Sequence, residues 1–208
     1  MEKSTANRII EILSFHYEDK PALNFSTPYQ LLIAVILSAQ CTDERVNKVT
    51  AKLFLEHGTA ESMLTLSEQQ LEKYIYSCGL YKNKARHILL ASKDIIERFN
   101  GQVPSSLEDL RTLAGVGRKT ANVVYSVAFG KDAIAVDTHV FRVANRIGLV
   151  DATTPEKTER QLMQILEKKT WSKAHHYLIY HGRARCKAKN PDCENCPIKE
   201  LCLKKFKR

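Results

Sequence analysis

Four cysteines near the C-terminal end of the chain have the spacing of a metal centre. Cys186, Cys193, Cys196 and Cys202 follow the pattern C-x6-C-x2-C-x5-C. Four thiolates in one short loop can bind one centre, and two kinds of centre compete. Zinc usually takes two close C-x2-C pairs, whereas this loop has a single close pair flanked by longer arms. Longer arms suit the separated irons of a cubane, so the spacing favours an iron–sulfur cluster, with zinc as the alternative.

The net charge of the chain is concentrated around this loop. The 208 residues contain 32 Lys and Arg against 23 Asp and Glu, a formal net charge of +9. Residues 168–208 contain twelve of the basic and three of the acidic residues, so they account for the whole excess. A localised basic surface indicates a polyanionic partner, most often nucleic acid, although a solvated basic tail would have the same composition.

A glycine-rich turn in the middle of the chain has the pattern of a phosphate-binding hairpin. Gly115-Val116-Gly117 joins two expected helices, and Arg118 follows directly. The glycines permit a tight turn and leave backbone N–H groups bare at the start of the second helix, where the helix dipole favours phosphate. The combination predicts a helix–hairpin–helix contact with the DNA backbone. The alternative is an ordinary corner between helices with basic residues nearby by chance.

Lys119 is a candidate nucleophile, because it falls in the first turn of the expected second helix. The helix dipole disfavours a cation in that turn, which favours the neutral, nucleophilic form of a lysine. Nucleophilic lysines attack sugar or carbonyl carbons and form Schiff bases. A plain phosphate contact is the alternative role for this side chain.

Asp137 is a candidate catalytic carboxylate at the start of another expected helix, in the run Ala135-Val136-Asp137-Thr138-His139. An Asp in this place can cap the helix, and capping alone would explain it. Its carboxylate could also stabilise an oxocarbenium-like sugar, as carboxylates do in glycoside hydrolysis.

The elements that position these residues are predicted to be helices. The glycines that follow runs of helical periodicity, where a positive φ ends a helix, are Gly58, Gly79, Gly101, Gly130, Gly148 and Gly182. The predicted helix starts are Thr27-Pro28, Thr154-Pro155 and capping boxes from Ser67, Ser105 and Thr153. About ten helices are expected, and residues 133–136, the one strand-like run, are short enough to be a buried loop. The predicted fold class is therefore all-α.

Composition excludes several classes of protein. The apolar content of 44% and the charged content of 26% are ordinary for a globular protein and exclude intrinsic disorder. No apolar run reaches the ~18 residues of a transmembrane helix. No apolar signal-peptide core follows Met1, so a reducing, cytoplasmic location without membrane contact is expected. In that setting we expect Cys41 and Cys78 to be buried thiols, and His175 and His176 to be ordinary helix residues.

Together, these motifs closely resemble those of the endonuclease III family, DNA glycosylases with abasic-site lyase activity in the helix–hairpin–helix superfamily. The resemblance extends over nearly the whole chain. It is carried by residues 115–124, residues 135–143, the four-cysteine loop, residues 37–43 with Gln40, and the motif Gly79-Leu80-Tyr81-x-x-Lys84-Ala85. One position departs from the family pattern, which usually has proline where this chain has Ala114. The change removes rigidity but no chemical group, so at most a modest effect on DNA affinity is expected.

The resemblance implies two helical lobes with the substrate cleft between them. One lobe is a six-helix barrel that carries the hairpin, residues 21–133. The other combines residues 1–20 with residues 134–208 and carries a [4Fe–4S] cluster. The implied ligands of the cluster are the four cysteines of the loop.

The resemblance also implies roles for individual residues. Lys119 is the expected nucleophile toward the sugar C1′, and Asp137 is the expected catalytic carboxylate. Gln40 is expected to fill the gap left by an extruded nucleotide, and Leu80 to enter the opposite strand as a wedge; the alternatives are a helix-end polar residue and a core leucine. The hairpin residues expected to bind DNA are Gly115, Val116, Gly117 and Arg118.

Base excision repair is the function that the resemblance implies. The expected partner is double-stranded DNA with oxidised or ring-saturated pyrimidines or abasic sites, and a monomer is expected to cut it by β-elimination through a lysine Schiff base. An adenine glycosylase acting on mismatches is one alternative, but that family usually lacks a lysine at the position of Lys119 and carries a further C-terminal domain. A non-catalytic DNA-binding module is another alternative. An electron-transfer protein is a third, and it leaves Lys119 unexplained.

Overall fold

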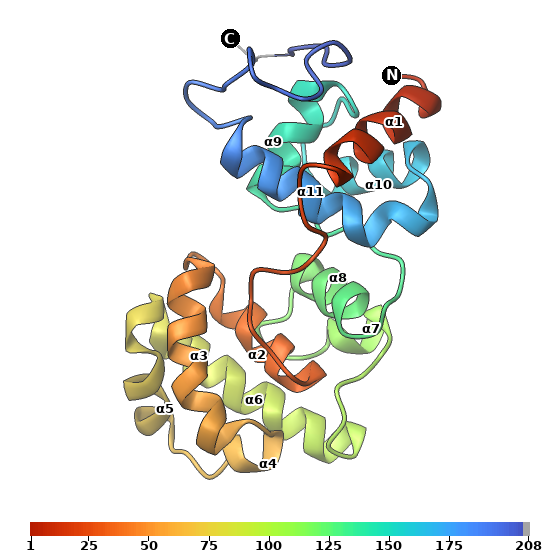
Figure 1. The fold of residues 1–208 in the computed structure, drawn as a ribbon. Coiled ribbons are helices and arrows are strands. Elements are labelled where there is room, and N and C mark those ends of the chain that lie inside the picture. Colours follow the sequence, from red (N-terminus) through yellow and green to blue (C-terminus); the bar gives the residue numbers. More distant parts are fainter. Residues whose placement is uncertain (206–208) are drawn as a thin grey trace. The chain divides into compact units, whose positions relative to one another are not determined.

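Helices make up all the regular secondary structure in residues 1–205, the part of the chain that the computed structural model describes. There are eleven α-helices and two short 3-10 helices in that range, and no strand (Figure 1). Residues 133–136 form a buried loop. None of the helices in this range is long and apolar enough to cross a membrane. The predicted all-α fold class is confirmed.

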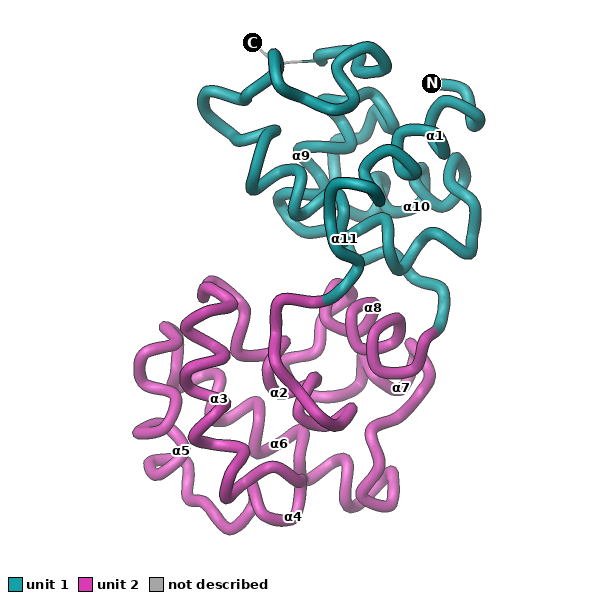
Figure 2. The backbone as a smooth tube through the Cα atoms, viewed as in Figure 1, with its two compact units in different colours: residues 1–20, 131–208 teal, residues 21–130 magenta. Residues whose placement is uncertain are grey.

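The chain forms two compact units (Figure 2). Unit 1 combines residues 1–20 with the chain from residue 131 onward, and unit 2 is the continuous segment 21–130. The helices of unit 1 are α1 (Lys3–Ser14), α9 (Thr138–Ile147), α10 (Pro155–Ile165), η2 (Lys168–Thr170) and α11 (Trp171–Ala184). The N-terminal helix α1 packs against α10 and α11, far along the chain, and α9 packs against α10 and α11.

Unit 2 is built around one helix that is apolar on nearly every side. Its helices are α2 (Pro28–Leu37), α3 (Asp43–His57), α4 (Ala60–Met63), α5 (Glu68–Ile75), η1 (Tyr76–Cys78), α6 (Tyr81–Phe99), α7 (Leu107–Leu110) and α8 (Arg118–Val127). Residues 31–37 of α2 are all buried, as expected of a helix that is hydrophobic all round. α2 packs against α3, α6 and α8, so it supports the helices that carry the predicted DNA-binding residues.

Local capping chemistry begins three of these helices at the residue that the sequence predicts. Thr27, Ser67 and Thr154 each accept a backbone N–H from the first turn of the helix that follows, so these three predicted starts are confirmed. Ser106 rather than Ser105 caps α7, one residue later than predicted.

The prediction that Gly182 ends a helix is wrong, because Gly182 lies inside α11. A Cβ at this position would lie 2.9 Å from Cγ2 of Val143 on α9. Glycine at this position therefore allows α9 and α11 to cross closely, and it does not end a helix.

Candidate functional site

The hairpin between α7 and α8 requires glycine at one of its two glycine positions. Gly115 has a φ of +76°, and a Cβ built on it would lie 2.9 Å from the Cβ of His87, so a side chain there is both strained and crowded. Gly117 has an ordinary φ of −82° and nothing within 4 Å of an added Cβ. The fold therefore does not require glycine at position 117. The absence of a side chain there leaves the hairpin surface open to a ligand.

The first turn of α8 forms a surface that suits a phosphate group. Its N-cap is Gly117, which provides no side chain to bind the N–H groups of the turn. Arg118 and Lys119 are exposed in this turn, at the positive end of the helix dipole. Val116 is only 6% exposed and belongs to the core of unit 2, so its side chain is not available to DNA.

Gln40 and Leu80 lie on neighbouring turns of unit 2. Gln40 follows α2 with a φ of +54°, and Leu80 precedes α6 with a φ of +49°. The carbonyl oxygen of Gln40 is 4.0 Å from the position of an added Cβ on Gly79. Both residues are exposed, Leu80 to 56%, so the alternative of a core leucine is wrong. Left-handed backbone at two adjacent exposed positions is strained, and such strain concentrates at functional surfaces.

Asp137 lies in unit 1 and caps α9. Its Oδ1 accepts the backbone N–H of Val140 at 2.7 Å, as the capping role predicts. Its Oδ2 lies 3.4 Å from Nδ1 of His139, and its side chain is 19% exposed. The Val140 N–H therefore holds the carboxylate at the helix start, whereas Nδ1 of His139 makes no hydrogen bond within the described part of the chain. Sequence analysis does not single out His139; its signal is its place two residues after Asp137 at a helix start.

The four cysteines of the loop line one small cavity in unit 1, together with Ile147, His181 and other residues of α9 and the loop. Burial raises the pKa of Cys196 and of Cys202, and the neighbouring thiols raise it further. Such a crowded set of thiols gives up its protons most readily to a positively charged centre. Within residues 1–205, no three His, Cys, Asp or Glu side chains are placed to hold a single metal ion. A cubane binds its thiolates at separated irons, and the residues present fit such a cluster.

Two arginines of α9 hold the cluster loop. The Arg142 guanidinium donates from Nη2 to the carbonyl oxygens of Gly182, at 2.9 Å, and Cys186, at 3.2 Å. Arg146 donates from Nη2 to the carbonyl oxygen of Ala188 at 2.9 Å. Sequence analysis misses both arginines. Their signal is the i, i+4 spacing, which places both on one face of α9.

His181 lies between the protein core and one of the four loop cysteines. Its Nε2 is 3.7 Å from Sγ of Cys196, and its Nδ1 is 3.0 Å from the hydroxyl oxygen of Tyr17. Burial lowers the pKa of His181 to about 4, so the ring is neutral and carries one N–H. If Nε2 of the neutral ring donates its hydrogen bond to the sulfur, Nδ1 accepts a hydrogen bond from the Tyr17 hydroxyl.

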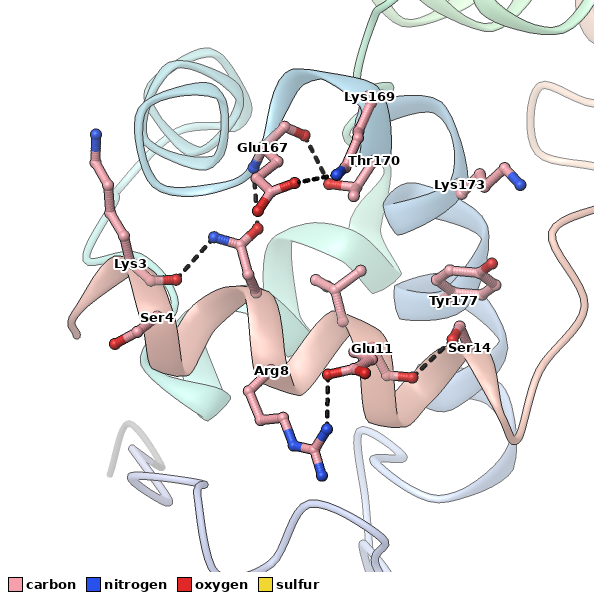
Figure 3. A pocket seen from close by; sticks show the side chains of 12 residues that line it. Lys3, Ser4, Arg8, Glu11, Ser14, Glu167, Lys169, Thr170, Lys173 and Tyr177 are labelled. Atoms are coloured by element: carbon pink, nitrogen blue, oxygen red, sulfur yellow. Dashed lines mark hydrogen bonds and ion pairs between the residues drawn. The ribbon is translucent and has the colours of Figure 1, made fainter.

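A wide pocket of about 910 Å³ lies elsewhere in unit 1, between α1 and the η2–α11 segment (Figure 3). Four of its charged side chains form pairs within the pocket, with Arg8 2.7 Å from Glu11 and Lys169 2.8 Å from Glu167. None of the predicted site residues lines this pocket.

Two family comparisons cover these features. Residues 33–168, which contain the hairpin and Asp137, match the family described as HhH-GPD superfamily base excision DNA repair protein. Residues 186–202, bounded by the first and last of the four cysteines, match the iron–sulfur binding domain of endonuclease III.

Whole-chain relatives and solved structures agree with these matches. Endonuclease III of Rickettsia conorii is 49% identical over 203 residues, which cover 97% of each chain. Endonuclease III of Escherichia coli (strain K12) is 45% identical over 202 residues, 95% of this chain and 96% of the relative. A trapped endonuclease III–DNA covalent intermediate superposes with a TM-score of 0.93 at 44% identity, covering 98% of this chain and 97% of that one. A non-covalent endonuclease III–DNA complex gives 0.92 at 43% identity, with coverages of 98% and 96%.

These similarities confirm the predicted cofactor and class of enzyme. The loop that follows α11 binds a [4Fe–4S] cluster, as the spacing of its cysteines favours. The hairpin and the cluster loop each fall within one of the two family matches. The chain belongs to the endonuclease III family, the bifunctional DNA glycosylases and abasic-site lyases of base excision repair within the HhH-GPD superfamily.

Proposed function

We propose that this protein removes oxidised or ring-saturated pyrimidines from double-stranded DNA and then cuts the strand at the resulting abasic site. The observation that carries the proposal is the exposed Lys119 in the uncapped first turn of α8, directly after the hairpin. The protein acts as a monomer in the bacterial cytoplasm, on the DNA of the nucleoid.

The DNA backbone is held by the hairpin and by the basic cluster loop. The N–H groups at the start of α8 and the Arg118 side chain bind phosphates next to the lesion. Lys187, Lys189 and Lys204 are exposed on the cluster loop and add further phosphate contacts. Because each phosphate contact releases counterions, binding weakens steeply as the salt concentration rises.

The turns that carry Gln40 and Leu80 open the duplex. Leu80 presents an exposed apolar side chain, which enters the stack of the opposite strand at little desolvation cost. The amide of Gln40 replaces hydrogen bonds that the extruded nucleotide leaves behind. Extrusion is easiest where damage has already weakened pairing or stacking, which contributes to the selectivity.

Lys119 attacks C1′ of the extruded nucleotide with the lone pair of Nζ, once its ammonium group has given up a proton. The N-glycosidic bond breaks, the base leaves with the bonding electrons and takes up a proton, and Asp137 stabilises the positive charge that develops on the sugar. Opening of the sugar ring gives an iminium between Nζ and C1′. Loss of a proton from C2′ then expels the oxygen of the 3′ phosphate with the C3′–O electrons, and water releases the lysine. An abasic sugar enters the same sequence as its aldehyde, with loss of water.

The [4Fe–4S] cluster supplies structure rather than a chemical step in this scheme. When bound, it cross-links the four cysteines and makes residues 186–202 a rigid basic platform. Arg142 and Arg146 of α9 hold the same loop through its carbonyl oxygens. The platform therefore stays attached to the helix that begins at Asp137.

Borohydride trapping tests the proposal. Duplexes with a ring-saturated pyrimidine or an abasic site are expected to be nicked, and reduction is expected to link the wild-type protein covalently to the strand. Lys119→Gln is expected to give no adduct, whereas Lys93→Gln, an exposed lysine on α6, is expected to behave as wild type. Release of adenine from a mismatch without an adduct would instead identify an adenine glycosylase. Binding without cleavage would identify a non-catalytic module.

A further inference from the structure

We propose that Lys84 is a positioning residue, whose buried ammonium group ties together the two turns that carry Gln40 and Leu80. The proposal rests on the role in opening DNA that the proposed function gives to those two residues. Lys84 itself reaches neither turn's surface, because its side chain lies in the interior of unit 2 and is 4% exposed.

The ammonium group joins the ends of two helices. Its Nζ donates to the carbonyl oxygen of Leu37 at 2.8 Å and to that of Cys78 at 2.6 Å. Leu37 is the last residue of α2, and Cys78 is the last residue of η1. Carbonyls at the end of a helix lack an intrahelical partner, so each of these hydrogen bonds satisfies a group that would otherwise be buried and unpaired.

A lysine is an expensive choice for this position if packing is its only purpose. Burial lowers the pKa of Lys84, and the titratable groups that act on it are the thiols of Cys41 and Cys78, with no carboxylate among them. A buried cation without a counterion costs free energy, and an apolar side chain of similar volume is often at least as stable. The requirement for the ammonium group therefore lies in the geometry that it imposes on the two carbonyls.

That geometry reaches the two DNA-opening residues within a few bonds. Gln40 comes three residues after Leu37, and Leu80 comes two residues after Cys78. Both have positive φ, and the carbonyl oxygen of Gln40 lies 4.0 Å from the position of a Cβ on Gly79. With both turns fixed to one Nζ, they move as a single body. A wedge and a gap-filling side chain can then enter opposite strands of one base pair at a constant separation.

Lys84→Met tests the proposal, because it removes the ammonium group and keeps the unbranched apolar stem. The affinity of the variant is measured for a duplex with a stable abasic-site analogue and for the same undamaged duplex, at one salt concentration. We expect the ratio of the two affinities to fall about tenfold, equivalent to about 1.4 kcal/mol. The affinity for undamaged DNA should change by less than about twofold, because that duplex is held mainly through its phosphates. Lys93→Met, an exposed change on the same helix, should leave the ratio unchanged.

A fluorescent base opposite the abasic-site analogue reports the opening step directly. Wild-type protein should unstack this base and brighten it on saturation, and Lys84→Met should brighten it less at saturation. If Lys84 only stabilises the fold, Lys84→Met would lower the melting temperature without changing either the affinity ratio or the brightness of the base. An unchanged ratio, or equal losses on both duplexes, would overturn the proposal.

Lys84→Gln provides a second variant in case Lys84→Met does not fold. Its amide is neutral and one bond shorter, so it reaches at most one of the two carbonyls, and a smaller fall in the ratio is expected. If neither variant folds, Lys84 supports the core rather than the turns and the proposal is wrong. Failure of the proposed function is a separate outcome, because it shows as the absence of a wild-type borohydride adduct whatever the Lys84 variants do.

Discussion

The guanidinium of Arg142 donates a hydrogen bond to the carbonyl oxygen of Cys186 at 3.2 Å, so the helix that Asp137 caps also holds the first of the four loop cysteines. The same Nη2 binds the carbonyl oxygen of Gly182 at 2.9 Å. A single side chain thus joins α9, the end of α11 and the start of the cluster loop. Loss of this contact is expected to disturb the cluster and the Asp137 cap together.

Arg142→Met is expected to lower the free energy of unfolding by about 2–3 kcal/mol, because two carbonyls lose a hydrogen bond from a charged donor. It is also expected to reduce the iron and sulfide content of the purified protein. Urea denaturation and metal analysis measure the two effects. Arg8→Met, at an exposed pair with Glu11 in the same unit, should change neither. An Arg142 variant with full iron content and unchanged stability would contradict this role.

The two hairpin glycines are expected to respond differently to alanine. Gly115→Ala should destabilise the protein by about 1–2 kcal/mol or more, since its φ is positive and His87 leaves no room for a Cβ. Gly117→Ala should leave the unfolding free energy within about 0.5 kcal/mol of wild type but weaken DNA binding. Urea titrations and binding to duplex DNA separate the two effects. The reverse pattern would show that the hairpin surface is not the DNA contact.

Substitutions at Asp137 are expected to separate capping from catalysis. Asp137→Ser keeps a capping oxygen, so its unfolding free energy should stay within about 0.5 kcal/mol of wild type, whereas Asp137→Ala should lose about 1 kcal/mol. Both variants should release base about a hundredfold more slowly or worse, because neither has a carboxylate beside the sugar. Single-turnover base release measures this rate. A serine variant with the wild-type rate would leave Asp137 with a capping role alone.

Acid is expected to destabilise the protein through the buried His176. Burial lowers the pKa of His176 to about 4, below the ordinary value of 6.5 that the unfolded chain restores. Between these two values the unfolded state binds a proton that the folded state does not, so stability falls as the pH drops from about 6.5 toward 4. Between pH 7 and pH 5, the free energy of unfolding of His176→Gln should therefore fall by up to about 2 kcal/mol less than that of the wild type. Equal losses in urea titrations of both proteins would show that His176 does not contribute.

The local features of this protein follow from its sequence, because short-range chemistry decides them. Caps such as Thr27, Ser67 and Asp137 accept N–H groups three residues away, and the cysteine spacing is contained in one loop. A helical period and a capping residue are sufficient for such features. The same local reasoning gives the wrong result at Gly182, where the reason for glycine is the side chain of Val143 on another helix.

Two side chains to which the sequence motifs assign no role act across long distances in the chain. Lys84 binds the carbonyl oxygen of Leu37, 47 residues earlier, and Arg142 binds that of Cys186, 44 residues later. Every residue has the same backbone carbonyl group, so no pattern of residue types shows which carbonyl a side chain will bind. The hint for Lys84 is its place in the motif Gly79-Leu80-Tyr81-x-x-Lys84-Ala85, and packing decides whether its side chain is buried or extends to solvent.

Mapping the reduced adduct tests the central claim most directly, because the claim is that Lys119 forms the Schiff base. Wild-type protein is reacted with abasic-site DNA in borohydride, the adduct is digested with protease and nuclease, and the modified peptide is sequenced by mass spectrometry. The nucleotide remnant is predicted to lie on Nζ of Lys119. A remnant on the N-terminal amine or on any other lysine, or efficient trapping by Lys119→Gln, would contradict the account.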